Sequence, residues 1–279
     1  MVTRVNRKEL ILLSLEEDIQ HGDITTDSLE LGETEARAKL LAKESGILAG
    51  LEVFSETFYL VDDEIKIEPF IKDGEHIEAG TLICKISGRS ASMLKAERVA
   101  LNFVQRLSGI ATLTSELVAK IGNNRARLLD TRKTTPLMRQ LEKYAVRIGG
   151  GYNHRFGLYD MIMLKENHIS SAGSITRAVA LVRKNDTSHK LEVEVTNLEE
   201  LAEAVSCGVD RVMLDNMSLS DMREAVNHYH GKVELEASGN VNLSTISDIA
   251  ATGVDFISSG SMTHSYKSMD ISLIFEKGR

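Results

Sequence analysis

The chain has 279 residues, of which 42% are hydrophobic and 27% are charged, and its net charge is -8 at pH 7. This length allows one large α/β domain or two smaller ones, and the composition is that of an ordinary globular protein. The acidic balance argues against a general nucleic-acid-binding surface.

The cysteines and the apolar runs indicate the cellular compartment of the protein. Cys84 and Cys207 stand far apart and no C-x-x-C pattern occurs, so we expect neither a disulfide framework nor a zinc motif. A reduced cytoplasm fits this best. No apolar run reaches eighteen residues and the first residues carry no long apolar segment, so we expect no membrane span and no signal peptide.

The first part of the chain is expected to be an α+β module. Apolar residues at helical spacing predict a helix at 4–20. Glycine turns then separate short strands, with one helix at 52–59 between them; the strands are expected at 36–42, 63–70, 76–80 and 82–88. Residues 90–121 are expected to be helical, in two pieces that meet at Gly109.

From residue 126 onward the pattern alternates between strand and helix. Strands are expected at 126–130, 160–165, 191–195, 210–214, 232–237 and 254–258. The helices between them are expected at 136–147, 172–184, 198–206, 219–229 and 243–251. Repeated βα units imply a parallel sheet with right-handed crossovers, here closing as a barrel, although six strands do not assure an eight-stranded one.

Polar residues stand at the ends of the late strands at near-regular steps. Glu194, Asp215, Ser238 and Ser259 are separated by 21, 23 and 21 residues, about the length of a βα unit. The strand ends of an α/β barrel build one site, so we expect these side chains to meet at one face.

A basic stretch precedes these residues. Between residues 131 and 158 there are six Lys or Arg and a single acid. Arg132 and Lys133 follow a strand and precede Thr-Thr-Pro, a typical helix start, so they are expected to point into the top of the barrel. His154 and Arg155 follow three glycines, which let backbone approach a ligand. Concentrated positive charge of this kind indicates a small polyanion as the ligand.

Some of this charge also has a purely structural interpretation. The spacing of Arg139, Lys143 and Arg147 favours a solvated basic helix face. The segment around Arg155 has a flexible surface loop as its alternative. Lys165 directly follows an apolar strand, and its alternative to a catalytic role is a salt bridge to Glu194 or Glu166.

The later residues suit a metal-bound sugar phosphate. Glu194 and Asp215 at strand ends suit Mg²⁺ or ribose hydroxyls, although either could merely neutralise Lys165. Two Ser-Gly loops, at 238–240 and 259–261, leave backbone N–H groups and hydroxyls available to a phosphate.

Longer motifs then carry a family resemblance along almost the whole chain. They are GDITT (22–26), AERVALNFVQRLSGIAT (96–112), DTRKTTP (130–136), EKYAVRIGGGYNHRFGLYD (142–160), MLKENHI (163–169), EVEV (192–195), LDN (214–216), EASGNV (236–241) and GVDFISSGSMTHS (253–265). With these motifs the chain resembles the quinolinate phosphoribosyltransferase family, also called nicotinate-nucleotide pyrophosphorylase (carboxylating).

The resemblance implies a fold, a reaction and an assembly. The fold is α/β: an N-terminal α/β sandwich at 1–110, to which 268–279 returns, and an incomplete, open α/β barrel at 111–267, the type II phosphoribosyltransferase fold. The reaction converts quinolinate and phosphoribosyl pyrophosphate to nicotinate mononucleotide, pyrophosphate and CO₂ with Mg²⁺, in de novo NAD biosynthesis. The assembly is a homodimer with sites between subunits, and a further assembly to a hexamer is left open.

The resemblance also assigns roles residue by residue. Quinolinate would be held by Thr131, Arg132, Lys133, His154, Arg155 and Lys165, with Arg98 reaching in from the partner subunit. Phosphoribosyl pyrophosphate would be held by Glu194, Asp215, Ser238, Gly239, Asn240, Ser259, Gly260 and Ser261. The catalytic set would be Lys133, Lys165, Glu194 and Asp215, with Glu194 and Asp215 also holding the metal, directly or through water.

The chain departs from the family pattern in two places. Leu137 and Met138 stand where glycine is common, and Glu166 stands where aspartate is usual; both departures bear on loop detail. Three alternatives remain. One is a related phosphoribosyltransferase for another anionic base or pyridine, or a paralogue repurposed in metal or cofactor metabolism. The others are a catalytically silent phosphate-ligand sensor and a barrel aldolase with Lys165 as its Schiff base.

Overall fold

The computed structural model describes residues 6–276, so residues 4–5 of the expected first helix and residues 277–279 lie outside the described part. The chain divides into two compact units. The first takes in the chain up to Thr114, residues 135–150 and the chain from Tyr266 onward; the second takes in residues 115–134 and 151–265. The expected domains were 1–110 and 111–267, so the difference lies mainly in 135–150, which belongs to the first unit.

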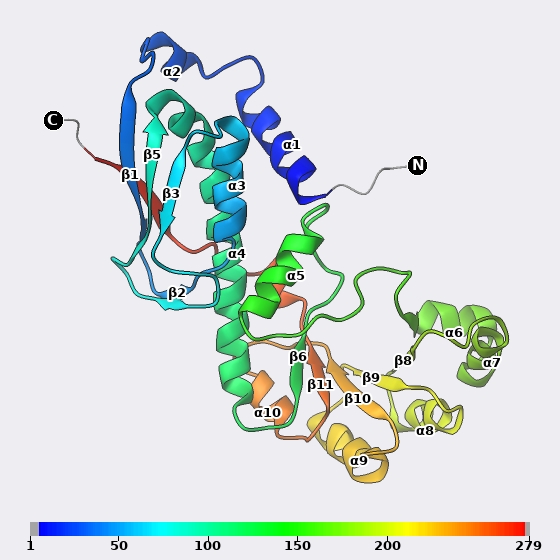
Figure 1. The fold of residues 1–279 in the computed structure, drawn as a ribbon. Coiled ribbons are helices and arrows are strands. Elements are labelled where there is room, and N and C mark those ends of the chain that lie inside the picture. The colour runs from blue at the N-terminus through cyan, green and yellow to red at the C-terminus, as the bar shows by residue number, and fades with distance from the viewer. Residues whose placement is uncertain (1–5, 277–279) are drawn as a thin grey trace. The chain divides into compact units, whose positions relative to one another are not determined.

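The first unit is built on a four-stranded antiparallel sheet in the order β12-β1-β5-β3 (Figure 1). Its strands are β1 (Glu35–Ala42), β3 (Lys66–Pro69), β5 (Leu82–Arg89) and β12 (Ile271–Phe275). A two-stranded ribbon joins β2 (Gly46–Ile47) and β4 (His76–Ile77). The helices are α1 (Arg7–Ile19), α2 (Ile24–Ser28), α3 (Leu51–Val61), α5 (Arg139–Ile148) and the part of α4 (Ser90–Ile121) up to Thr114.

Period-two burial explains how this sheet packs. Ala38, Leu40 and Ala42 alternate along β1 and are all buried, because successive strand residues point to opposite faces. Phe54 and Phe58 lie one turn apart on α3, fully buried, with ring centroids 5.0 Å apart. Each such side chain contributes about 1.5–3 kcal/mol on burial, so the helix is held mainly by its apolar face.

Helix α4 runs unbroken for 32 residues, so the expected break at Gly109 was wrong. The glycine has a packing role instead. A Cβ at position 109 would lie 2.1 Å from the backbone carbonyl oxygen of Lys267, closer than real Cβ contacts allow. Gly109 therefore lets the segment before β12 pass directly over the helix.

The second unit is a six-stranded, fully parallel sheet in the order β6-β11-β10-β9-β8-β7. The strands are β6 (Arg127–Leu129), β7 (Ile162–Leu164), β8 (Leu191–Val195), β9 (Arg211–Asp215), β10 (Glu234–Ser238) and β11 (Phe256–Ser258). Among the described strands β6 and β7 stand at the two edges without pairing with each other. The barrel is therefore open, as the resemblance implies.

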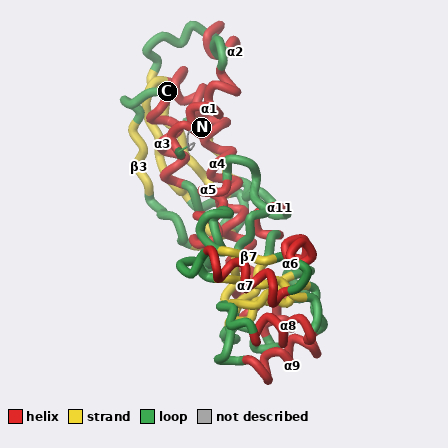
Figure 2. Tube along the Cα trace, turned by 90° about the vertical axis from the view of Figure 1, so that its right-hand side faces the viewer, coloured by secondary structure: helices red, strands yellow, loops and turns green. Residues whose placement is uncertain are grey.

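Helices cover this sheet in the order of a βα repeat. They are α6 (Glu166–Ala172), α7 (Ile175–Asn185), α8 (Leu198–Ser206), α9 (Leu219–Tyr229), α10 (Ile246–Ala250) and α11 (Ser261–His264). Helix α8 packs on β8 and β9, and α10 packs on β11; Figure 2 shows red helices around the yellow strands of this unit. Alternate strand positions are apolar and fully buried, as at Val193, Val212 and Leu235, while the positions between them carry polar and charged residues on the opposite face.

Three short helices were not expected from the sequence. Asp23 caps α2 by accepting hydrogen bonds from two backbone N–H groups. Helix α6 ends at Gly173, which has a φ of 98°, and Ser174 then caps α7; the helix expected at 172–184 is α7, and α6 is an additional helix before it. Helix α11 begins directly after Gly260. Within the described residues, none of the helices combines the length and apolar character needed to span a membrane.

Replacing Gly109 by alanine tests the packing of α4. Glycine to alanine inside a helix stabilises by about 1 kcal/mol when space allows. Here we expect Gly109→Ala to destabilise the protein by about 1–3 kcal/mol, because the added methyl group must displace backbone. Urea unfolding measures the change.

The matched control is Glu116→Ala, at an exposed position on the same helix. Its free energy of unfolding should change by less than about 0.5 kcal/mol. A Gly109→Ala protein as stable as the original would show that the Lys267 carbonyl does not lie against this helix.

Candidate active site

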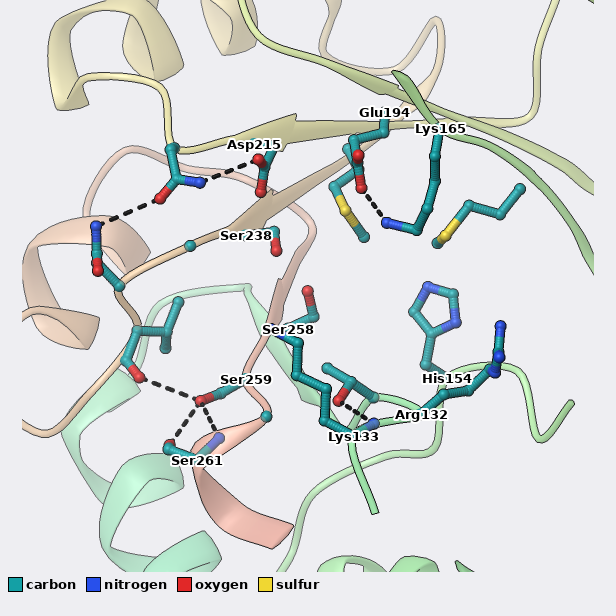
Figure 3. A pocket seen from close by; sticks show the side chains of 18 of the residues that line it. Arg132, Lys133, His154, Lys165, Glu194, Asp215, Ser238, Ser258, Ser259 and Ser261 are labelled. Atoms are coloured by element: carbon teal, nitrogen blue, oxygen red, sulfur yellow. Dashed lines mark hydrogen bonds and ion pairs between the residues drawn. The ribbon is translucent and has the colours of Figure 1, made fainter. Parts of the chain in front are cut away.

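A cavity of about 820 Å³ opens at the carboxyl ends of the parallel strands (Figure 3). Each strand of the second unit contributes a residue at, near or just beyond its carboxyl end, which is where α/β barrels build their sites. The expected site residues of this unit all line it: Thr131, Arg132, Lys133, His154, Arg155, Lys165, Glu194, Asp215, Ser238, Gly239, Asn240, Ser259, Gly260 and Ser261.

One expected residue is not brought to this cavity. Arg98 lies on α4 in the first unit, where it is exposed, and it is not among the described residues that line the cavity.

Six further lining residues were missed by the sequence analysis: Met163, Met213, Asn216, Val241, Ser258 and His264. A signal for two of them was available. Met163 stands two residues before Lys165, and Met213 two before Asp215. Residues two apart on a strand point to the same face, so the methionines had to lie beneath the charged residues.

Lys133 enters the cavity from the loop after β6. Its backbone oxygen accepts a hydrogen bond from Thr263 Oγ1 at 2.7 Å, and its backbone N–H donates to Thr131 Oγ1 at 3.0 Å. A Cβ at Gly260 would lie 2.9 Å from Lys133 Cδ and 3.0 Å from the His264 ring. The absence of a side chain at Gly260 therefore lets the lysine lie across this loop.

Arg155 is held on a loop that Asp130 anchors. Asp130 is fully buried and accepts hydrogen bonds from His154 N at 2.9 Å and Asn153 Nδ2 at 2.6 Å. Burial, and then the positive charge of Arg132, lower the pKa of Arg155. Two guanidinium groups that repel each other across a cavity make a site for an anion placed between them.

Lys165 and Glu194 form an ion pair inside the cavity (Figure 3). The salt bridge named above as the alternative for Lys165 is thus present. The side chains are 43% and 17% exposed, so solvent reaches both groups. A solvent-accessible ion pair of this kind contributes about 0–1 kcal/mol to the free energy of unfolding. An anionic ligand can therefore replace Glu194 as the partner of Lys165, and a cationic ligand can replace Lys165 as the partner of Glu194.

Asp215 and the loop after β10 form the next part of the wall. Asn216 Nδ2 donates to Asp215 Oδ2 at 3.0 Å, and Asn240 Nδ2 donates to Asn216 Oδ1 at 3.3 Å. Gly239 has a φ of 96°, and a Cβ there would lie 2.1 Å from Asn216 Oδ1. Glycine is thus required at 239 both by the backbone conformation and by the asparagine beside it.

The loop after β11 presents hydroxyl and N–H groups. Ser259 Oγ lies 2.7 Å from Ser261 Oγ and donates to the Val241 backbone oxygen at 3.1 Å. The Ser261 backbone N–H points to Ser259 Oγ at 3.3 Å, where α11 begins. Backbone N–H groups and hydroxyls in such a loop suit phosphate oxygens.

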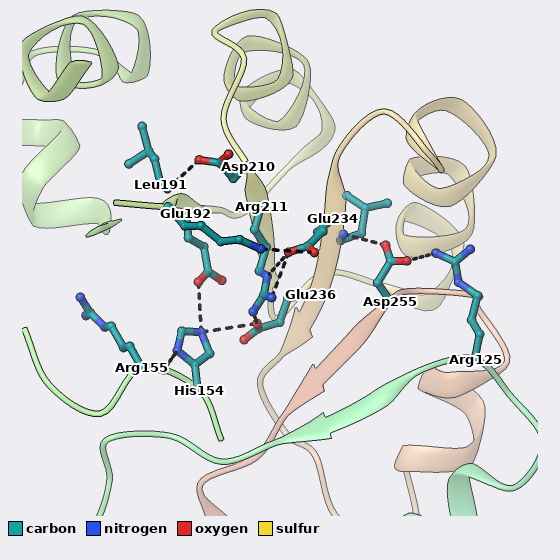
Figure 4. Close-up of polar contacts among 12 residues, drawn as sticks. Arg125, His154, Arg155, Leu191, Glu192, Asp210, Arg211, Glu234, Glu236 and Asp255 are labelled. Carbon is teal, nitrogen blue, oxygen red and sulfur yellow. Dashed lines mark hydrogen bonds and ion pairs between the residues drawn. The ribbon is translucent and has the colours of Figure 1, made fainter. Parts of the chain in front are cut away.

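A buried charged cluster lies on the same strands: Glu192, Glu236, Arg211 and His154 (Figure 4). His154 Nε2 is 3.0 Å from Glu192 Oε2 and 3.5 Å from Glu236 Oε2. Arg211 donates to Glu236 Oε2 at 3.0 Å. The sequence alone assigned no role to Glu192, Glu236 or Arg211.

Two sets of residues have the chemistry of metal ligands. Glu194 and Asp215 offer carboxylate oxygens to the open cavity, the donors that Mg²⁺ prefers together with water. His154, Glu192 and Glu236 offer one ligand atom each within 4.8 Å of one another, but in the buried cluster.

The basic helix face expected at Arg139, Lys143 and Arg147 is only partly confirmed. Arg147 is exposed, but Lys143 is 2% exposed and its neighbour Glu142 is fully buried. Glu142 accepts hydrogen bonds from Arg106 and from the Thr135 backbone N–H. None of the three basic residues is among the described residues lining the cavity.

Comparison with known proteins agrees with this architecture in both halves of the chain. The family model "Quinolinate phosphoribosyl transferase, N-terminal domain" matches residues 23–108, and the model "Quinolinate phosphoribosyl transferase, C-terminal domain" matches residues 110–274.

Individual relatives cover nearly the whole chain. The Arabidopsis thaliana protein named nicotinate-nucleotide pyrophosphorylase (carboxylating), chloroplastic, is 44% identical over 95% of this chain and 82% of its own. A Nicotiana tabacum protein named quinolinate phosphoribosyltransferase (decarboxylating) 2b, mitochondrial, is 42% identical over 95% and 81%.

Solved structures show the same fold. The nicotinate-nucleotide pyrophosphorylase of Francisella tularensis superposes with a TM-score of 0.94, at 44% identity over 99% of this chain and 98% of that one. With family models matching both parts of the chain and relatives above 40% identity, the chain belongs to the quinolinate phosphoribosyl transferase family.

Proposed function

We propose that this chain transfers a phosphoribosyl group from phosphoribosyl pyrophosphate to quinolinate and releases pyrophosphate and CO₂, a step of de novo NAD biosynthesis. The observation that carries the proposal is the single cavity that joins four cationic side chains to two carboxylates and two Ser-Gly loops. The relatives' names give the same reaction.

The cationic side of the cavity suits the two carboxylates of quinolinate. Arg132, Lys133, Arg155 and Lys165 line it together with Thr131. Arginine binds carboxylates through paired, charge-assisted hydrogen bonds. The mutual repulsion of Arg132 and Arg155 is relieved when a dianion lies between them, because the two positive charges then balance the two negative charges of the ligand.

The opposite side suits the ribose phosphate. The Ser259–Ser261 loop and the Ser238–Asn240 loop present hydroxyl and N–H groups for the 5′-phosphate. Glu194 and Asp215 lie between the two sides and suit ribose hydroxyls. This arrangement holds C1 of the ribose near the ring nitrogen of quinolinate, and such positioning lowers the barrier for joining two substrates.

The chemistry then needs position and charge rather than a nucleophilic side chain. The ring nitrogen forms a bond to C1 as the bond from C1 to pyrophosphate breaks. The transition state resembles an oxocarbenium ion, whose positive charge the carboxylates of Glu194 and Asp215 stabilise. Lys133 and Lys165 offset the negative charge of the leaving group and of the substrate carboxylates.

Decarboxylation follows transfer. Once alkylated, the ring nitrogen is cationic and stabilises the electron pair that remains on C2 when CO₂ leaves. A proton then takes the place of the carboxylate, and the product is nicotinate mononucleotide.

Magnesium belongs to this proposal as the cofactor. Glu194 and Asp215 would hold it, directly or through water, because both offer hard oxygen donors to the cavity. The bound ion would offset the charge that builds on pyrophosphate.

The assembly we propose is a homodimer in which Arg98 of the partner subunit completes the quinolinate site. Arg98 is exposed on α4, as a residue that serves a neighbouring subunit must be. The setting we propose is the cytoplasm: Cys84 and Cys207 are both free thiols.

The first prediction concerns the cationic side. Lys133→Ala and Arg155→Ala should each lower kcat/KM with quinolinate by at least about a hundredfold, because a charge-assisted contact to the substrate is lost. The control is Arg147→Ala, which removes an exposed charge outside the cavity and should change kcat/KM less than about twofold. Near-normal turnover by either cavity variant, with its fold intact, would overturn the site.

The second prediction concerns the partner's arginine. Arg98→Ala and Lys133→Ala proteins should each be inactive. Mixed dimers carry both defects in one site and neither in the other, so an equal mixture after random exchange should regain about a quarter of the original activity. With subunit exchange verified by mass spectrometry, a mixture that stays inactive would contradict a shared site.

The third prediction concerns the metal. Chelation with EDTA should abolish turnover, and added Mg²⁺ should restore it. Asp215→Asn should raise the Mg²⁺ concentration needed for half-maximal turnover, because one anionic ligand becomes neutral. Full turnover in EDTA would remove magnesium from the proposal.

A further inference from the structure

The buried cluster of Glu192, Glu236, Arg211 and His154 has no part in the reaction proposed above. Glu192 stands two residues before Glu194 on β8, and Glu236 stands two before Ser238 on β10. By the period-two rule these side chains share the face of the cavity residues but lie one layer deeper, about 6.5 Å along the strand. Both carboxylates are fully buried.

Charge balance dictates how such a cluster can exist. Two buried carboxylates face a single guanidinium group, that of Arg211, which also bonds half-exposed Glu234. An uncompensated buried charge costs several kcal/mol, so these carboxylates need further polar partners. The His154 side chain, 5% exposed, provides one through Nε2, which faces both carboxylates (Figure 4).

The contacts of the imidazole ring fix its tautomer. Burial lowers the pKa of His154, but hydrogen bonds and charge from Glu192 and Glu236 raise it to about 9 in net. The Arg155 backbone N–H opposes this by donating to Nδ1 at 2.7 Å, which favours the neutral ring. Because Nδ1 accepts this hydrogen bond, the ring carries its hydrogen on Nε2, which lies 3.0 Å from Glu192 Oε2.

Both ring nitrogens are therefore engaged by the protein. Nε2 is directed at the cluster and Nδ1 accepts from the Arg155 backbone. The ring has no donor to spare for a substrate carboxylate, so its effect on the ligand passes through the loop that carries Arg155. This differs from the direct quinolinate contact that the resemblance implies for His154.

We infer that Glu192 and Glu236 are positioning residues, which hold His154 from within the barrel and thereby fix Arg155 at the carboxylate-binding side of the cavity. This inference rests on the proposed function for its substrate. A divalent cation among His154, Glu192 and Glu236 is the competing arrangement, but the 3.0 Å between Nε2 and Oε2 is a hydrogen-bond length and Arg211 already supplies positive charge.

Two isosteric variants test the inference, Glu192→Gln and Glu236→Gln. Each should raise KM for quinolinate by about tenfold or more, because a neutral amide weakens the electrostatic contact with His154 and thereby loosens the loop. KM for phosphoribosyl pyrophosphate should change by less than about twofold, since its loops lie elsewhere in the cavity. A general loss of structure would raise both constants together.

Glu234→Gln is the matched control. Glu234 lies on the same strand as Glu236 and bonds the same Arg211, but it does not contact His154, so both KM values should stay as in the original protein. Thermal melting checks folding. Should a glutamine variant fail to fold, Glu192→Asp keeps the charge, withdraws it by one methylene group, and should show the same selective rise in KM.

A spectroscopic measurement separates this inference from the proposed function. ¹⁵N NMR of histidine-labelled, ligand-free protein, with the His154 signal assigned by its loss in His154→Asn, should show hydrogen on Nε2 and slow exchange. The glutamine variants should lose the slow exchange. This result stands even if the original protein fails to convert quinolinate, which would remove the proposed function alone.

Three outcomes would overturn the inference. One is an Nδ1–H tautomer in the original protein. Another is a normal KM for quinolinate in both folded glutamine variants. The third is stoichiometric binding of Zn²⁺ or Mg²⁺ to the ligand-free protein that Glu192→Gln abolishes, which would make the cluster a metal site.

Discussion

The register between neighbouring parallel strands determines where each polar side chain of the cavity lies. Asp215 is the direct partner of Ser238 across β9 and β10, and Ala237 is the partner of Ile257 across β10 and β11. A slip of one residue in any of these pairs would turn a whole strand over and bury its charged end residue among the apolar ones. The fully buried Val193, Val212 and Leu235 oppose that slip, so the hydrophobic layer fixes the polar one.

A second constraint is electrostatic. The cavity gathers positive charge on one side, and within it Lys165 pairs with Glu194. Weakly held, solvent-exposed pairs cost little to break, whereas the deeper charges of Glu192, Glu236 and Arg211 are costly to disturb. The protein thus places exchangeable ion pairs at the opening and fixed ones in the interior, which is the arrangement a site for charged substrates requires.

The sequence predicted the strand ends well because each carries its own local signal. Glu194, Asp215 and Ser238 stand at or near strand ends, at steps of one βα unit, and all three line the cavity. The role of Gly109 was misjudged, because the sequence does not distinguish a glycine that breaks a helix from one that lets a neighbouring backbone carbonyl pack closely against it. The exposure of Lys143 was misjudged for a related reason. Helical spacing predicts which face of the helix a side chain lies on, but not which other segment of the chain covers that face.

The interior cluster marks the limit of such analysis. Glu192 and Glu236 are 44 positions apart in the sequence, and their nearness follows only from strands β8, β9 and β10 being adjacent. Acidic residues on an otherwise apolar strand were the available signal, since buried carboxylates require partners. Neither Arg211 nor His154 could be named as that partner without the strand order.

The pairing of β12 with β1 bears on how the chain is made. Leu40 lies opposite Leu273 in that sheet. One edge of β1 can therefore form its hydrogen bonds only after β12, more than two hundred residues later in the chain, has been synthesised. The parallel sheet of the second unit lies wholly within residues that leave the ribosome before β12 does. Closing a long loop is slow, so the edge of β1 that pairs with β12 stays unpaired during synthesis. An unpaired strand edge can bind chaperones or pair with another chain. This edge is therefore where we expect the nascent chain to be most prone to aggregation.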